Sequence, residues 1–92
     1  MKGKAVILSQ KDNVATALAE LKEGEELKLT IADEDVPVKL RRAIPFGHKF
    51  SLRRIPKGKP VIKYGETIGT ATENIAPGDH VHVHNVISTR GR

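Results

Sequence analysis

The chain has 92 residues, the size of one small domain, and a domain of this length buries only about 60 to 65% of the surface that its unfolded form exposes. It contains no cysteine, which excludes disulfides and thiolate-held zinc or iron–sulfur sites and favours a reducing compartment. Its net charge of +5 is uneven, because residues 39–63 hold nine basic side chains and no acid, so this block is expected to face an anion or to be a solvated surface.

The first elements in chain order are predicted to be a strand and a helix. Residues 5–8 form a short apolar run typical of a strand. Asp12 stands where a helix N-cap would, and apolar residues follow at helical spacing as far as Leu21. Gly24 is placed to end that helix, which is the only one the sequence predicts.

The rest of the chain is predicted to form short strands. Polar and apolar residues alternate over 26–31 and 36–40, the pattern of half-buried strands, with a polar turn at 33–35 between them. Beyond these, prolines and glycines leave no room for a long helix. The gaps between them predict four more strands, at residues 49–53, 61–63, 67–72 and 80–86.

A short phrase also recurs three times: an aliphatic residue, a glycine three positions later and another aliphatic residue three beyond that. The copies are Leu21/Gly24/Leu27, Ile55/Gly58/Val61 and Ile75/Gly78/Val81. Each copy is expected to be a turn at which a strand enters the core. The copies are too irregularly spaced for a solenoid. We therefore predict a mainly β fold with one short α-helix, in a single domain over residues 1–92 with 88–92 as a tail or link.

Histidines are the first candidates for chemistry. His80, His82 and His84 alternate along a predicted strand, which would place their side chains on one face. Two imidazoles spaced in this way can share one divalent cation such as zinc, iron, copper or nickel. The alternative is a solvated strand face that happens to carry histidines.

Two further side chains lie in predicted turns. His48 precedes Lys49 in a proline-bounded turn, where the like charge disfavours the protonated imidazole and leaves a proton acceptor. A plain surface histidine is the alternative. Tyr64 lies at a predicted hairpin tip, where its phenol could bind a ligand hydroxyl. Covering one end of a barrel is the favoured role for Tyr64, because the chain has few other large residues.

Several classes of protein are excluded or disfavoured. The sequence has no phosphate loop, dinucleotide fingerprint, cysteine nucleophile or serine elbow. It has no apolar stretch near the roughly 18 residues that a membrane span needs, and no signal peptide, so we expect a soluble cytoplasmic protein. The scarcity of aromatic residues argues against single-stranded RNA as a ligand, and we expect neither a nucleic acid nor a membrane as a partner.

Four phrases stand out along the chain: Asp12-Asn13-Val14, Gly47-His48-Lys49, Ile62-Lys63-Tyr64-Gly65-Glu66 with Ile68-Gly69, and the run from His80 to Val86. Together and in this order they resemble the N-terminal SAF domain of the altronate and galactarate dehydratase family. The resemblance implies a β-clip fold and a lyase that eliminates water or sulfite from a hydroxylated carboxylic acid such as altronate or sulfolactate. The histidine run is less similar to the galactarate branch, so galactarate is the least expected substrate.

The resemblance also carries expectations for partners and residues. The chain stops near the point where the larger region would begin, so the resemblance implies a separate small subunit that is inactive without a large catalytic lyase subunit. A piece of a longer protein would look the same. A divalent metal, iron or manganese, is expected, with the large subunit as an alternative source of its ligands. The expected roles are catalysis for His48 and Lys49, substrate contact for Asn13, Tyr64 and His80, and metal binding for His82 and His84. A non-catalytic SAF module that binds a glycan or an acidic partner is the alternative.

Overall fold

The computed structural model describes residues 4–7, 9–31 and 34–88. Within these ranges the chain is all-β, with nine strands and no helix. The strands are β1 (Ala5–Val6), β2 (Val14–Ala17), β3 (Glu26–Ile31), β4 (Glu34–Lys39), β5 (Lys49–Ser51), β6 (Pro60–Lys63), β7 (Glu66–Ala71), β8 (His80–Val81) and β9 (Val86–Ser88). In the same ranges no helix exists that could cross a lipid bilayer.

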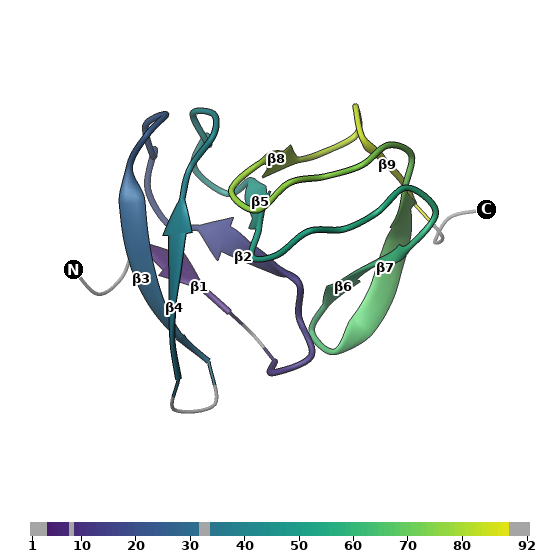
Figure 1. Cartoon of the computed structure of the whole chain (residues 1–92), viewed down its shortest axis with the longest axis horizontal. Helices are drawn as coiled ribbons and strands as arrows, with labels where there is room; N and C mark the ends of the chain where they lie inside the picture. Colours follow the sequence, from purple (N-terminus) through teal and green to yellow (C-terminus); the bar gives the residue numbers. More distant parts are fainter. Residues whose placement is uncertain (1–3, 8, 32–33, 89–92) are drawn as a thin grey trace.

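The described strands form three antiparallel sheets. A four-stranded sheet has the order β1-β2-β5-β8, a three-stranded sheet has the order β6-β7-β9, and β3 pairs with β4 as a long hairpin. Figure 1 shows the β3–β4 hairpin on one side of the four-stranded sheet and the β6-β7-β9 sheet on the other. The strand pairs of the central sheet therefore join parts of the chain that are far apart in sequence.

The helix predicted after Asp12 is wrong, because this segment contains β2. The strand lies between β1 and β5, and Val14, Ala15 and Ala17 are all buried there. Burial between two neighbouring strands overrides the helical spacing of the small apolar residues. Asp12 is likewise not a helix cap: its buried carboxylate accepts hydrogen bonds from the backbone N–H groups of Ser9 (3.1 Å) and Gly65 (2.8 Å).

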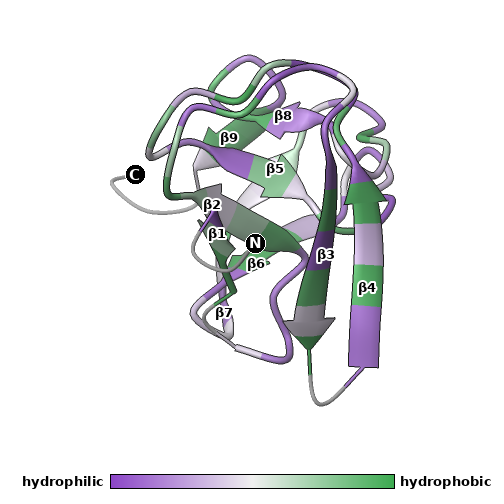
Figure 2. Ribbon diagram, turned by 90° about the vertical axis from the view of Figure 1, so that its left-hand side faces the viewer, coloured by the Kyte–Doolittle hydropathy of each residue, from purple (hydrophilic) through white to green (hydrophobic). Residues whose placement is uncertain are grey.

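Most of the predicted strands are confirmed. The prediction for residues 26–31 matches β3, and Figure 2 shows hydrophobic and hydrophilic bands following one another along β3 and β4. The predicted turn at 33–35 is partly wrong, because Glu34 and Asp35 already pair with β3, whereas residue 33 lies outside the described residues. Residues 8 and 89–92, parts of a predicted strand and of the predicted tail, also lie outside them.

The recurring aliphatic–glycine–aliphatic pattern does mark turns, and the structure contains a fourth turn of the same kind. Gly24, Gly58 and Gly78 each follow a β-bridge residue by three positions and have φ near +85°, the left-handed region that favours glycine. Gly47, with φ +83°, forms the same turn after Ile44. The sequence pattern missed this copy because Phe50 stands where the others have an aliphatic residue. The bridges Leu21 to Ile44 and Ile55 to Ile75 hold the four turns in two pairs.

Two groups of buried apolar side chains make the core. The larger contains the fully buried Phe50 and lies between the four-stranded sheet and the β3–β4 hairpin. The smaller is centred on Val61 and Val81, between β6, β7 and β8. The predicted covering role of Tyr64 is wrong, since it is 63% exposed at the β6–β7 turn, with φ +59°.

Candidate metal centre

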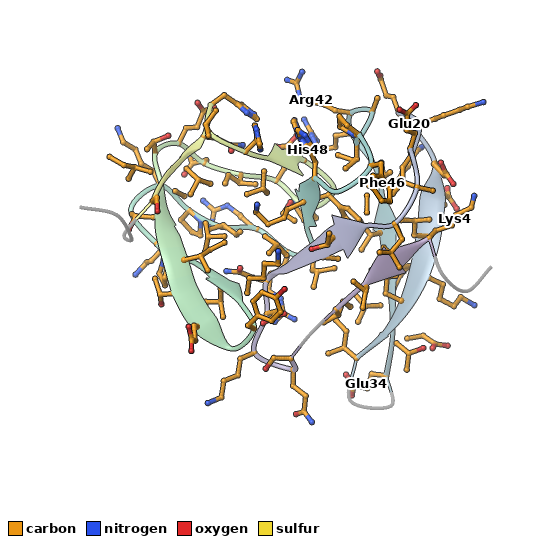
Figure 3. The ribbon with its side chains drawn as sticks, turned by 180° about the vertical axis from the view of Figure 1, so that it is seen from behind. Lys4, Glu20, Glu34, Arg42, Phe46 and His48 are labelled. Atoms are coloured by element: carbon orange, nitrogen blue, oxygen red, sulfur yellow. The ribbon has the colours of Figure 1, made fainter. Side chains whose placement is uncertain are left out.

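Three histidines converge where β5 and β8 begin. His48 immediately precedes β5, His80 opens β8, and His82 follows β8. One ring nitrogen from each lies within 4.8 Å of the others, and all three side chains are half-buried. The closest pair is His48 Nδ1 and His80 Nε2, at 2.8 Å. We refer to His48, His80 and His82 as the histidine trio; Figure 3 shows His48 at the end of the molecule where Arg42 also lies.

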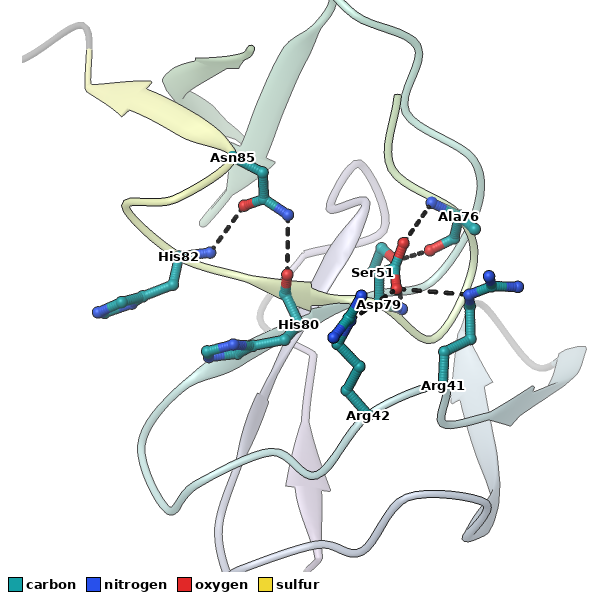
Figure 4. A network of polar contacts seen from close by, with 8 residues as sticks. All are labelled: Arg41, Arg42, Ser51, Ala76, Asp79, His80, His82 and Asn85. Carbon is teal, nitrogen blue, oxygen red and sulfur yellow. Dashed lines mark hydrogen bonds and ion pairs between the residues drawn. The ribbon is translucent and has the colours of Figure 1, made fainter. Parts of the chain in front are cut away.

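The trio differs from the predicted pair of His82 and His84. The strand predicted over 80–86 is interrupted by a turn at 82–85, so these two histidines do not share a strand face. Asn85, which is buried, causes the interruption: its Oδ1 accepts from the backbone N–H of His82 (3.0 Å), and its Nδ2 donates to the carbonyl of His80 (2.9 Å) (Figure 4). His84 is exposed, and its ring centroid lies 5.3 Å from that of His80.

The surroundings disfavour the protonated form of two members of the trio, His80 and His82. Burial lowers the pKa of His80 to about 4, and the positive charges of its histidine neighbours and of Lys49 act in the same direction. Burial also lowers the pKa of His82, again with help from His48 and Lys49. A neutral imidazole has a nitrogen lone pair available for a metal ion or for a proton.

Lys49 lies beside the trio at the start of β5, where it pairs with Val81 of β8. Burial lowers the pKa of its amine, and the charge of Lys63 lowers it further. Lys49 and His82 line a mainly apolar hollow of about 280 Å³ that extends to Val86. A lysine in such a place releases its proton more readily than an exposed one, which suits a role in proton transfer.

The donor set fits a divalent transition metal. Imidazole nitrogens suit zinc, iron, copper and nickel, and three histidine ligands leave further coordination positions open. Ligand nitrogens on one such ion are about 3 Å apart or slightly more, since each bond is about 2.1 Å long. The 2.8 Å between His48 Nδ1 and His80 Nε2 is close to that spacing.

The other predicted site residues lie elsewhere. The amide of Asn13 binds the backbone of β6, donating to the carbonyl of Pro60 (3.0 Å) and accepting from the N–H of Ile62 (2.8 Å). Tyr64 lies at the β6–β7 turn, at the opposite end of the molecule from β8 (Figure 1). The structure therefore brings His48, Lys49, His80 and His82 together but not Asn13 or Tyr64, whose predicted substrate contacts stay predictions.

Comparison with known proteins identifies the family. Residues 3–89 match the model of the altronate/galactarate dehydratase SAF domain. The chain belongs to this family. Its SAF domain is 51% identical over 74 residues to the altronate dehydratase of Escherichia coli (strain K12), a match that covers 80% of this chain but only 14% of that protein. The altronate dehydratase of Bacillus subtilis (strain 168) is 36% identical over 78 residues, 85% of this chain and 15% of its own length.

A second kind of relative is matched along nearly its whole length. The alpha subunit of (2R)-sulfolactate sulfo-lyase from Chromohalobacter salexigens is 35% identical to this SAF domain over 88 residues, which covers 92% of this chain and 94% of the subunit. The chain is thus homologous both to a small lyase subunit and to the N-terminal region of a much longer dehydratase. It spans about one seventh of the altronate dehydratases that it matches.

Proposed function

We propose that this protein is the small subunit of a two-subunit lyase that eliminates water or sulfite from a hydroxylated carboxylic acid such as altronate or sulfolactate. The observation that carries the proposal is the histidine trio, since three converging imidazoles on one small β-domain form an incomplete metal or substrate site. The relationship to a sulfo-lyase alpha subunit supports a two-subunit assembly. The long β3–β4 hairpin agrees with the β-clip fold that we propose for the domain.

We assign each group a role from its position. His48, His80 and His82 would hold a divalent ion, iron or manganese, which supplies a positive centre for the charge that develops beside the substrate carboxylate. Lys49, whose pKa is lowered by burial, is the group best suited to accept a proton from carbon. His48 remains the alternative proton acceptor, because its turn opens to the surface.

The site needs a second surface to exclude water. The trio is only half-buried, and large apolar side chains next to it in the chain face outward: Phe46 is 66% exposed and Val83 is 82% exposed. Exposed apolar residues around polar groups are typical of a protein interface. We therefore propose that a large catalytic subunit covers the trio and supplies the remaining ligands.

Metal titration of the full chain tests this assignment without any partner. Co²⁺ absorbance or calorimetry should detect one bound ion, and His48→Ala, His80→Ala and His82→Ala should each weaken binding by at least about tenfold. His84→Ala is the matched control, because it removes an exposed neighbouring histidine and should leave affinity unchanged. Binding that depends on His84 but not on His48 would contradict the assignment.

A further inference from the structure

Two arginines next to the histidine trio share a single carboxylate. The Nε atoms of Arg41 and Arg42 lie 3.4 Å and 3.8 Å from Oδ1 of Asp79 (Figure 4). Both distances exceed the roughly 2.7 to 2.9 Å of a tight charge-assisted hydrogen bond. The arginine side chains remain 62% and 71% exposed, and among the described residues no other acid forms an ion pair with either. Two guanidinium groups facing one carboxylate leave a net positive charge at the surface.

Asp79 is fixed by the turn that carries it. Its Oδ2 accepts from the backbone N–H of Ala76 (3.0 Å), and its own N–H donates to Oγ of Ser51 (3.2 Å). Ser51 also donates its hydroxyl to the carbonyl of Ala76. These bonds attach the turn to β5, so the orientation of the carboxylate does not depend on the arginines.

The arginine segment is packed directly on the same turn. The backbone N–H of Arg41 donates to the carbonyl of Gly78 (3.0 Å), and a Cβ at Gly78 would lie only 2.1 Å from the carbonyl oxygen of Lys39. The residue after Asp79 is His80, a member of the trio. Figure 4 shows the side chain of Arg42 extending between His80 and Asp79, and Figure 3 shows Arg42 and His48 at the same end of the molecule. The arginines are therefore held at the edge of the histidine site.

We propose that Arg42, supported by Arg41, binds the carboxylate of the hydroxylated acid while the hydroxyl-bearing part of that acid faces the trio. This inference rests on the proposed function and adds the group that recognises the substrate's charge. A guanidinium offers a planar pair of donors that matches a carboxylate, or the sulfonate of a sulfonated acid. Two exposed guanidinium groups that share one carboxylate keep a positive charge to offer to the anionic end of the substrate. Arg42 is the main candidate because its ion pair is the longer and its side chain the more exposed.

Kinetics of the assembled enzyme test the proposal. In the complex of the full chain with its co-expressed large subunit, Arg42→Gln should raise KM for altronate or sulfolactate by about 10- to 100-fold, the usual worth of a charge-assisted pair of hydrogen bonds. Metal content and subunit association should not change. Arg42→Lys should restore part of the loss. Arg53→Gln and Arg54→Gln, in a second exposed arginine pair of the same basic block, are the controls and should leave KM unchanged.

Two outcomes would overturn the proposal. An unchanged KM would remove Arg42 from substrate binding, and weakened subunit association would assign it to the interface. An independent readout is NMR titration of the isolated full chain with D-altronate or (2R)-sulfolactate, and with the uncharged polyol erythritol as the negative probe. Shifts of the Arg42 Nε–H signal with the acids alone support the proposal, and their absence contradicts it. If Arg42 responds while the trio binds no Co²⁺, the metal assignment fails and the carboxylate site stands.

Discussion

His48 Nδ1 lies 2.8 Å from His80 Nε2, although 32 residues separate the two along the chain. This is hydrogen-bond distance, and which of the two nitrogens donates depends on the tautomers of the rings. The His82 ring stacks on that of His48, with centroids 4.3 Å apart. Burial, and after it the charges of His48 and of the other neighbouring groups, lowers the pKa values of His80 and His82.

The stability of the metal-free chain should fall in acid because of His80. Its pKa is about 4 in the folded chain and 6.5 ordinarily, so between these values the unfolded chain binds more protons. The free energy of unfolding therefore rises with pH across this window and is independent of His80 above it. Urea unfolding in the presence of a chelator should show a shallower pH slope for His80→Asn. His84→Asn is the control; an equal change in its slope would contradict the prediction.

Replacing Asn85 should disrupt the histidine trio without changing any of its imidazole rings. Asn85→Ala leaves the N–H of His82 and the carbonyl of His80 without their side-chain partner, which should cost about 1 to 3 kcal/mol of stability. Because the turn at 82–85 then loses its cross-link, Co²⁺ affinity should fall by about tenfold or more. Asn74→Ala is the control, since Asn74 accepts from the backbone of Lys57 in an exposed turn. Undiminished Co²⁺ binding by Asn85→Ala would show that His82 needs no such support.

Alanine substitutions at Gly78 and Gly24 should separate two sources of destabilisation, backbone strain and steric overlap. Both have φ +85°, so alanine at either position should lose about 1 to 2 kcal/mol through backbone strain. At Gly24 nothing lies within 4 Å of a new Cβ, whereas at Gly78 the Cβ would meet the backbone carbonyl of Lys39. We expect Gly78→Ala to destabilise the chain by more than about 3 kcal/mol. Equal losses for both variants in denaturant titrations would contradict the close packing of this turn.

The isolated chain should have no lyase activity. A chain of this size buries a smaller fraction of its surface than a larger domain does, and the trio and Lys49 are only half-buried, so water reaches the site. Purified chain should not turn over D-altronate or (2R)-sulfolactate, and activity should appear when the large subunit is added. His48→Gln should then lower the turnover number of the complex. Turnover by the isolated chain would refute the two-subunit assignment.

Local patterns predicted much of the fold, and contacts between distant segments account for most of what they missed. The alternation over 26–31 predicts β3 correctly because every second side chain of that strand faces the core. The residues after Asp12 have helical spacing, but their neighbours in β1 and β5 decide their conformation. The choice of His80 rather than His84 depends on the Asn85 turn; an asparagine inside the predicted strand was the local signal for it. Nothing local indicates that His48 meets His80.

The order of strands in the central sheet gives the site a thermodynamic role. β8 pairs only with β5 in the described part of the chain, so the trio exists only after the last strand of that sheet has docked. In the unfolded chain His48 is separated from His80 by 32 residues, so the three imidazoles of the trio do not act together. An ion bound by all three histidines would therefore stabilise the folded form more than the unfolded chain, and the midpoint of thermal unfolding would rise with metal concentration. Metal concentration would then set the fraction of the chain that is folded.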